Sequence, residues 1–230
     1  MRLFTDNLAL VAVESDVVRE MDRRAIDEFG IPGAVLMENA GAAAADVAGD
    51  MVGGRGTVLV MAGSGNNAGD GFVIARHLVN RGVEVEVATA VTGEGYKGDA
   101  SLNYRIIEKM RLPMRLWQRP PGDGKTYGLI VDALVGTGLS GKLRAPYVEM
   151  IDFINGSGTP VLAVDIPSGL DGDDGSVRTA AVNATTTVTF ALPKKGLFVG
   201  RGPFHAGKVI LADIGMPSNV YPRGKALPRS

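Results

Sequence analysis

The stretch from Val58 to Asn80 constrains the fold more than any other part of this 230-residue chain. It opens with the apolar, β-branched run 58–62, which is typical of a buried strand. A turn rich in glycine and asparagine follows, and from Gly69 onward apolar residues recur at helical spacing. A strand, a tight turn and a helix in this order can bind an anion, because a helix begins with unpaired N–H groups and a partial positive charge.

Strand-like and helix-like segments alternate along the rest of the chain. The predicted strands cover residues 58–62, 83–91, 129–133, 160–165, 185–190 and 208–212, with at most a short strand at 114–117. The predicted helices cover residues 14–29, 34–47, 69–80, 100–110 and 146–155, and Ser15 or Asp16 is the expected N-cap of the first. This alternation predicts an α/β fold: a three-layer, doubly wound, Rossmann-like sandwich with a mostly parallel central sheet and extra N-terminal helices. We expect a single domain over residues 1–230, with peripheral tails at 1–14 and 218–230.

Composition excludes several classes of function. The 24 Lys and Arg residues balance 25 Asp and Glu residues, so no basic field recruits nucleic acid or an anionic membrane. The chain has no cysteine, which excludes disulfides, thiolate chemistry and zinc–thiolate sites. No apolar run approaches the roughly 20 residues of a membrane helix, and the N-terminus does not resemble a signal peptide. We therefore expect a cytoplasmic protein with neither nucleic-acid nor membrane partners.

Three of the predicted strands end in polar or glycine-rich segments, at residues 63–70, 132–141 and 165–171. In a doubly wound sheet, ligands bind beyond the carboxyl ends of the strands, near the switch point. With the usual strand order, these three strands are neighbours at the centre of the sheet. We therefore expect five side chains to meet in one crevice: Asn66, Asn67, Asp132, Asp165 and Ser168.

Each of these segments also has a plain structural interpretation. Asn66 and Asn67 suit a left-handed turn, and taken alone they leave the two interpretations about equal. Asp132 and Asp165 could be caps or partners of surface lysines, but carboxylates at the ends of two apolar strands favour a ligand role. The loop at 136–144 combines three glycines with hydroxyl and basic residues, which favours a phosphate nest over a flexible turn.

Other patterns argue against familiar nucleotide sites. The glycine turn lacks the Lys-Ser/Thr of a phosphate-binding NTPase loop, and it has one residue too many for the G-x-G-x-x-G dinucleotide fingerprint. The second predicted strand also ends without the carboxylate that holds an adenosine ribose. Hydride transfer with a classically bound NAD is therefore not supported. Residues 171–175 lack the spacing of a calcium loop, and His77 and His205 fit packing or surface positions better than a catalytic role.

Several motifs in the same order resemble those of the NAD(P)H-hydrate epimerases, the YjeF N-terminal domain family. The signature is residues 65–71 (GNNAGDG) followed by 75–78 (ARHL). Supporting motifs lie at 36–41 (LMENAG), 132–138 (DALVGTG), 165–169 (DIPSG) and 193–196 (PKKG), so the resemblance covers roughly residues 15 to 216. One departure is Ala68, where the family usually has glycine. A methyl group there costs little if this residue is not at positive φ.

The resemblance implies both a substrate and a site. The substrate is a hydrated NADH or NADPH with a hydroxyl at C6 of the nicotinamide ring, and the reaction interconverts its R and S epimers for a stereospecific dehydratase. Potassium is the implied cofactor, with Asn67, Asp132 and Ser168 as its ligands. The implied substrate-binding residues are Asn66, Asn67, Ala68, Gly69, Asp70, Gly136, Thr137, Gly138, Leu139, Ser140, Gly141, Lys142 and Asp165. Members are commonly homodimers, and many are fused to the dehydratase.

Chemistry at C6 requires a group that gives and takes a proton at its oxygen, and we assign this role to Asp165. Both expulsion of the hydroxyl and opening of the ring would scramble this centre. The main alternative is a non-catalytic Rossmann-like module for nucleotide binding or dimerisation, for which the set of Asn67, Asp132, Asp165 and Ser168 would serve no purpose. A nucleotide-dependent transferase or kinase is disfavoured because no P-loop is present.

Overall fold

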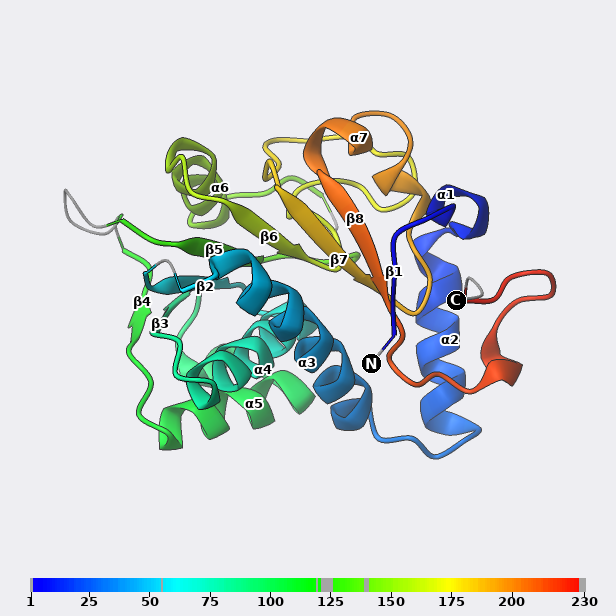
Figure 1. Cartoon of the computed structure of the whole chain (residues 1–230), viewed down its shortest axis with the longest axis horizontal. Coiled ribbons are helices and arrows are strands. Elements are labelled where there is room, and N and C mark those ends of the chain that lie inside the picture. Colours follow the sequence, from blue (N-terminus) through cyan, green and yellow to red (C-terminus); the bar gives the residue numbers. More distant parts are fainter. Residues whose placement is uncertain (1, 55, 119, 121–125, 139–140, 228–230) are drawn as a thin grey trace.

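The central sheet has eight strands among the residues that the structure, a computed structural model, describes: 2–54, 56–118, 120, 126–138 and 141–227. The strand order is β1-β8-β7-β6-β5-β2-β3-β4, and every pairing is parallel except that of the edge strand β1 with β8 (Figure 1). The strands are β1 (Leu3–Phe4), β2 (Val58–Ala62), β3 (Val85–Thr89), β4 (Met114–Leu116), β5 (Leu129–Ala133), β6 (Val161–Val164), β7 (Thr186–Phe190) and β8 (Lys208–Ala212).

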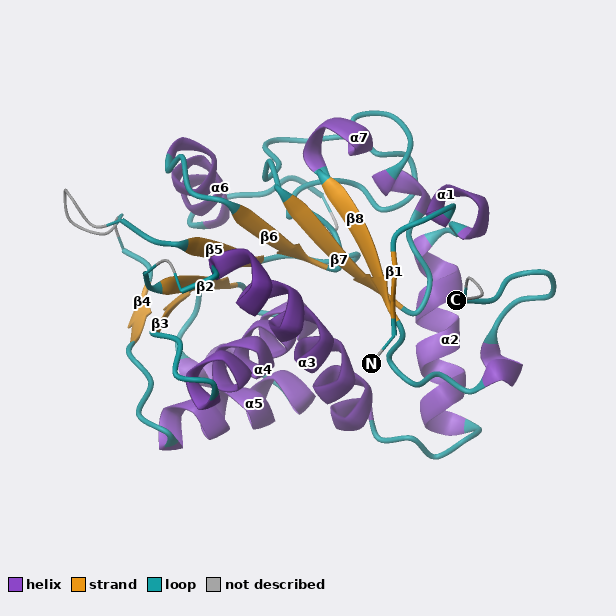
Figure 2. Cartoon of the chain, viewed as in Figure 1, coloured by secondary structure: helices purple, strands orange, loops and turns teal. Residues whose placement is uncertain are grey.

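Helices cover both faces of the sheet (Figure 2). They are α1 (Leu8–Val11), α2 (Ser15–Asp27), α3 (Gly33–Val52), α4 (Asn66–Asn80), α5 (Gly98–Lys109), α6 (Tyr147–Gly156) and α7 (Gly202–His205), with 3-10 turns η1 (Gly93–Gly95), η2 (Lys195–Leu197) and η3 (Ser218–Val220). On one face α4 packs between α3 and α5, whereas α6 packs on the other. No helix within the described part of the chain is both long and apolar enough to span a bilayer.

The central strand β2 shows why the predicted three-layer sandwich is correct. Its five residues are fully buried, with Val58 and Val60 in the core under α3 and α4. Leu59 and Met61, which point the other way, join the core under α6. A strand buried on both faces reads as a continuous apolar run, as it does here. The prediction that β2, β5 and β6 are neighbours is confirmed.

The structure differs from the predictions mainly at the ends of elements. Helix α4 begins at Asn66, three residues before the predicted start, and α3 continues to Val52. The N-terminal segment, expected to be a tail, contributes strand β1 to the edge of the sheet. Ser15 and Asp16 are both wrong as N-caps, because Ser15 already lies inside α2. The first turn is capped instead by a distant residue: the Ser15 N–H donates to Asp173 Oδ1 at 2.6 Å.

Replacing Asp173 with alanine is expected to lower the free energy of unfolding by about 1 kcal/mol, the usual cost of losing a side-chain cap. The variant leaves the Ser15 N–H without its carboxylate, and Ser15 is only 3% exposed. Urea unfolding of variant and wild type measures the difference. Asp152→Asn, at an exposed position on α6, is the control. An Asp173→Ala variant as stable as wild type would contradict the capping role.

Candidate functional site

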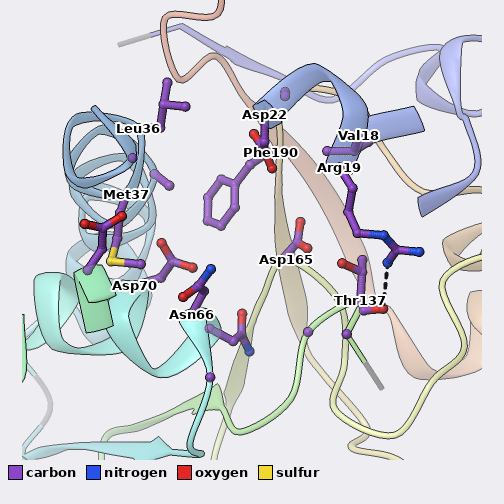
Figure 3. A pocket seen from close by; sticks show the side chains of 18 of the residues that line it. Val18, Arg19, Asp22, Leu36, Met37, Asn66, Asp70, Thr137, Asp165 and Phe190 are labelled. Carbon is purple, nitrogen blue, oxygen red and sulfur yellow. Dashed lines mark hydrogen bonds between the residues drawn. The ribbon is translucent and has the colours of Figure 1, made fainter. Parts of the chain in front are cut away.

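A cavity of about 500 Å³ opens at the carboxyl ends of the central strands. Its walls come from the segments that follow β2, β5, β6 and β7, together with α2 and the first turn of α3 (Figure 3). This is the place where a doubly wound sheet binds its ligands. The polar side chains that line it are Arg19, Asp22, Ser64, Asn66, Asn67, Asp70, Asp99, Thr137, Tyr147, Asp165 and Lys194.

The glycine turn before α4 serves packing as well as access. A Cβ at Gly63 would overlap the backbone carbonyl of Leu134, and one at Gly69 would lie 2.6 Å from Met37 Sδ. Gly65 has open space around its Cβ position and is the N-cap of α4. Asn66 is therefore the first residue of the helix, so the left-handed-turn interpretation of the asparagine pair is wrong. Both asparagines line the cavity at the positive end of α4.

Ala68 and Gly69 lie on the protein side of this first turn. Ala68 is fully buried in the core and helical, so its methyl group causes no strain, as expected. Gly69 is buried against α3 and α5, where its missing side chain lets the helices approach. Among the implied substrate-binding residues of α4, only Asn66, Asn67 and Asp70 reach the cavity surface.

The loop after β5 forms a further wall. Gly136, Thr137 and Gly138 line the cavity, and the Thr137 carbonyl accepts a hydrogen bond of 3.2 Å from Arg19 of α2. Leu139 and Ser140, also implied in substrate binding, lie outside the described residues. Gly141 and Lys142 are described, exposed and not part of the cavity lining.

Asp132 and Ser168 are fully buried and are not among the residues that line the cavity. Ser168 donates to Asp132 through Oγ at 2.6 Å and through its backbone N–H at 2.8 Å, and its Oγ accepts from Val135 N at 2.8 Å. Burial raises the pKa of Asp132 to about 6, although these hydrogen bonds favour the ionised form. No cationic side chain of the described residues pairs with this carboxyl group.

Asn67 approaches the same buried pair from the cavity side. It is 8% exposed, and its Nδ2 has no hydrogen-bond partner among the described residues. A Cβ on Gly136 would lie 3.4 Å from its Oδ1. Gly136 adjoins Val135, which Ser168 contacts, so Asn67, Asp132 and Ser168 surround one short stretch of loop. Within the described chain, no cluster of three His, Cys, Asp or Glu side chains could hold a metal. The carboxylate, hydroxyl and amide oxygens here are hard ligands.

Asp165 is held in an unusual backbone conformation at the cavity wall. Its φ is +67°, in the left-handed region that non-glycine residues seldom occupy. Lys194 donates to its Oδ1, and Thr189 Oγ1 lies 3.3 Å from the same oxygen. The Lys194 side chain is 2% exposed, and it also contacts Thr189 Oγ1 and the Phe190 carbonyl. Lys194 therefore fixes one oxygen of the Asp165 carboxylate.

Three further carboxyl groups line the cavity with Asp165, namely those of Asp22, Asp70 and Asp99. Burial raises the pKa of Asp22 to about 6. The charge of Lys194 lowers this pKa, and the charge of Asp165 raises it. Burial also raises the pKa of Asp70 well above its usual value, and the charges of Asp165 and Asp22 add to this shift. Close carboxyl groups with unlike neighbours are typical of sites that move protons.

Sequence reasoning missed two of these residues as functional candidates. In the sequence Lys194 belongs only to the PKKG motif, yet a lysine four residues after the end of a buried strand is a signal for a buried partner. Asp22 lies on an amphipathic helix, where a carboxylate is usually solvated. The two histidines lie away from the cavity: His77 Nε2 is 2.8 Å from Glu38 Oε1, and His205 Nδ1 is 3.2 Å from the Val182 carbonyl.

Replacing Asp22 with asparagine is expected to change the pH dependence of stability. The folded pKa of about 6 exceeds the ordinary 3.8, so the folded protein keeps a proton that the unfolded chain releases between these values. Wild-type stability therefore falls as pH rises through this window, whereas the variant lacks this loss. The free energy of unfolding of the variant minus that of wild type should rise from about pH 4 to 6 and then level off. Urea unfolding across this range tests it, and a constant difference would contradict it.

Comparison with known proteins gives matches over most of the chain. A family model described as YjeF-related protein N-terminus matches residues 33–196. An NAD(P)H-hydrate epimerase of Weissella koreensis is 37% identical over 208 residues, which cover 90% of this chain and 92% of the relative. A bifunctional NAD(P)H-hydrate repair enzyme of Salinibacter ruber is 39% identical over 222 residues, which cover 90% of this chain but 41% of the relative. This chain thus spans about two fifths of the length of such bifunctional relatives.

The fold also matches a solved structure. The crystal structure of yeast ynu0, YNL200c, has a TM-score of 0.79 to this chain, covering 95% of it and 96% of the yeast chain. At 22% sequence identity, this similarity concerns the fold.

Proposed function

This chain belongs to the family of YjeF-related protein N-termini, and on that premise we propose that it is an NAD(P)H-hydrate epimerase. The observation that carries the proposal is a cavity at the switch point of the sheet, in which Asp165 is fixed by a buried lysine and which three other carboxyl groups also line. Relatives of about the same length bear the name of this activity. The bifunctional names of the longer relatives support a functional coupling to a dehydratase.

The proposed substrate is NADH or NADPH hydrated at C6 of the nicotinamide ring. C6 then carries a hydroxyl group and is bonded to the ring nitrogen. Protonating and expelling the hydroxyl leaves a cation that the nitrogen stabilises, and ring opening with reclosure would also invert the centre. Asp165 is the proposed group that gives and takes the proton at the C6 oxygen. It lines the cavity, and Lys194 and Thr189 bond only its Oδ1, so its Oδ2 is left for the substrate.

The proposed function is tested by supplying the purified R epimer together with an S-specific dehydratase. This chain should restore reduced dinucleotide at a rate that scales with its concentration. A rate equal to that of a blank without the chain would contradict the proposal, and would instead favour a binding or dimerisation module.

Asn67, Asp132 and Ser168 are the proposed ligands of a potassium ion. The residues fit such an ion, because within the described part of the chain Asp132 is a buried carboxyl group without a cationic partner and Asn67 Nδ2 has no hydrogen-bond partner. The bound ion would supply positive charge that organises the loop after β5, since a monovalent ion is a weak Lewis acid.

Replacing potassium by lithium is expected to lower both activity and stability. A ligand that binds only the folded chain stabilises it by about 2.7 kcal/mol at 100 times its dissociation constant. Thermal unfolding in matched potassium and lithium chloride measures this effect apart from activity. Asn67→Ala should unfold at the same temperature in both salts. Equal unfolding and equal rates of the wild-type protein in both salts would refute the potassium site.

A further inference from the structure

Two carboxyl groups point into the cavity from opposite sides. Asp70 projects from α4, and Asp165 projects from the segment that follows β6 (Figure 3). Lys194 and Thr189 contact only Oδ1 of Asp165, so Oδ2 has no hydrogen-bond partner among the described residues. Asp70 likewise forms no side-chain hydrogen bond or ion pair within that part of the chain. Each side of the cavity therefore presents a carboxyl oxygen that a ligand can use.

The two sides differ in their surroundings. A buried lysine donates to Oδ1 of Asp165 and is the cationic partner of this side chain. Among the described residues no lysine contacts Asp70. Burial together with the nearby charges of Asp165 and Asp22 favours its protonated form, against the weaker opposing charge of Lys194. Two carboxyl groups with such unlike neighbours across a single cavity form the arrangement that general acid–base catalysis needs.

Epimerisation at C6 also needs proton transfer on two sides of the substrate. The hydroxyl groups of the R and S epimers lie on opposite faces of the nicotinamide ring, and the cation formed by loss of either hydroxyl is planar at C6. A side chain must come within about 2.6–3.2 Å of the oxygen that it protonates. One fixed carboxyl group therefore serves one face, and inversion through the planar cation places the second proton transfer on the other face.

We propose that Asp70 is a second catalytic residue, and that Asp70 and Asp165 transfer protons on opposite faces of the ring. This inference rests on the proposed epimerase function. Asp70 gives its proton to the C6 hydroxyl, the C–O bond breaks, water leaves, and the nitrogen lone pair forms the C=N bond. A solvent water then adds to the other face and gives a proton to Asp165, while the C=N electrons return to nitrogen. The reverse reaction exchanges the two roles, and proton exchange with solvent restores the resting enzyme.

The experiment follows solvent oxygen in water enriched in oxygen-18. Wild-type enzyme should place oxygen-18 at C6 of every epimerised product molecule. Asp70→Asn and Asp165→Asn should each lower epimerisation by about 10²–10⁴-fold. Each variant should still exchange the C6 oxygen of one epimer with solvent, with retention of configuration. The epimer that exchanges should differ between the two variants. A merely structural role would not produce this crossed pattern. Asp152→Asn is the control, and Asp70→Ser replaces Asp70→Asn if the latter fails to fold.

Failure of this inference is distinct from failure of the proposed function. A wild-type chain that does not epimerise the hydrate would contradict the function itself. A wild-type chain that epimerises while keeping the original oxygen would overturn the two-carboxyl mechanism. The mechanism is also overturned if a folded Asp70 variant epimerises at the wild-type rate, or if both variants retain exchange of the same epimer.

Discussion

Asp165→Asn is expected to lower kcat/KM for epimerisation by about 10²–10⁴-fold, the usual contribution of a group that transfers a proton in the transition state. Asparagine is the most informative replacement because it has the size of aspartate and tolerates the left-handed conformation of this position, where φ is +67°. The amide can accept a hydrogen bond from Lys194 but cannot carry the transferred proton. The coupled assay with the R epimer and the S-specific dehydratase measures the loss.

The Asp165 variant also leaves Lys194 buried without its anionic partner, so its stability must be measured alongside its activity. Thermal unfolding sets a temperature at which the variant is fully folded, and the rate is measured there. Asp152→Asn provides the matched control, since it makes the same chemical change at an exposed position on α6. A folded Asp165→Asn enzyme that works at the wild-type rate would exclude the proton-transfer role.

The layers of this fold follow from local sequence patterns. Apolar runs such as 58–62 and 129–131 predict strands buried on both faces, and the helical segments between them require parallel pairing. Strand order then follows from the general rule for doubly wound sheets, which also places the cavity. The start of α4 was predicted too late because asparagine and glycine are common turn residues. Here the helix begins with them, and its free N–H groups face the cavity.

The contacts that complete the site depend on residues far apart in the chain. Asp22 and Lys194 are 172 positions apart, yet both face the cavity beside Asp165. Local patterns assign charged side chains to solvent, which is their usual place. Asp173 caps α2 from a similar distance. Such pairs become visible only when the topology brings their segments together, so local patterns located the cavity but missed two of the charged groups that face it.

Lys194→Met is expected to lower the free energy of unfolding by about 3 kcal/mol, toward the lower end for removal of one member of a buried ion pair. The lysine side chain is 2% exposed, whereas the Asp165 side chain is 15% exposed and keeps some access to water in the cavity. Epimerisation should also fall, because Oδ1 of Asp165 loses its main contact. Lys195→Met is a close control, since this neighbouring side chain is 49% exposed and its pair with Glu14 lies at the surface.

A double-mutant cycle separates the ion pair from the packing of the lysine stem. If the cost of Lys194→Met arises from an uncompensated carboxylate, then adding Asp165→Asn removes that charge and recovers part of the lost stability. The coupling energy should then be about 1–3 kcal/mol, within the range for residues in direct contact. Losses that simply add would assign the effect to packing alone, and Lys194 would then have no part in fixing the carboxylate on which the proposed chemistry depends.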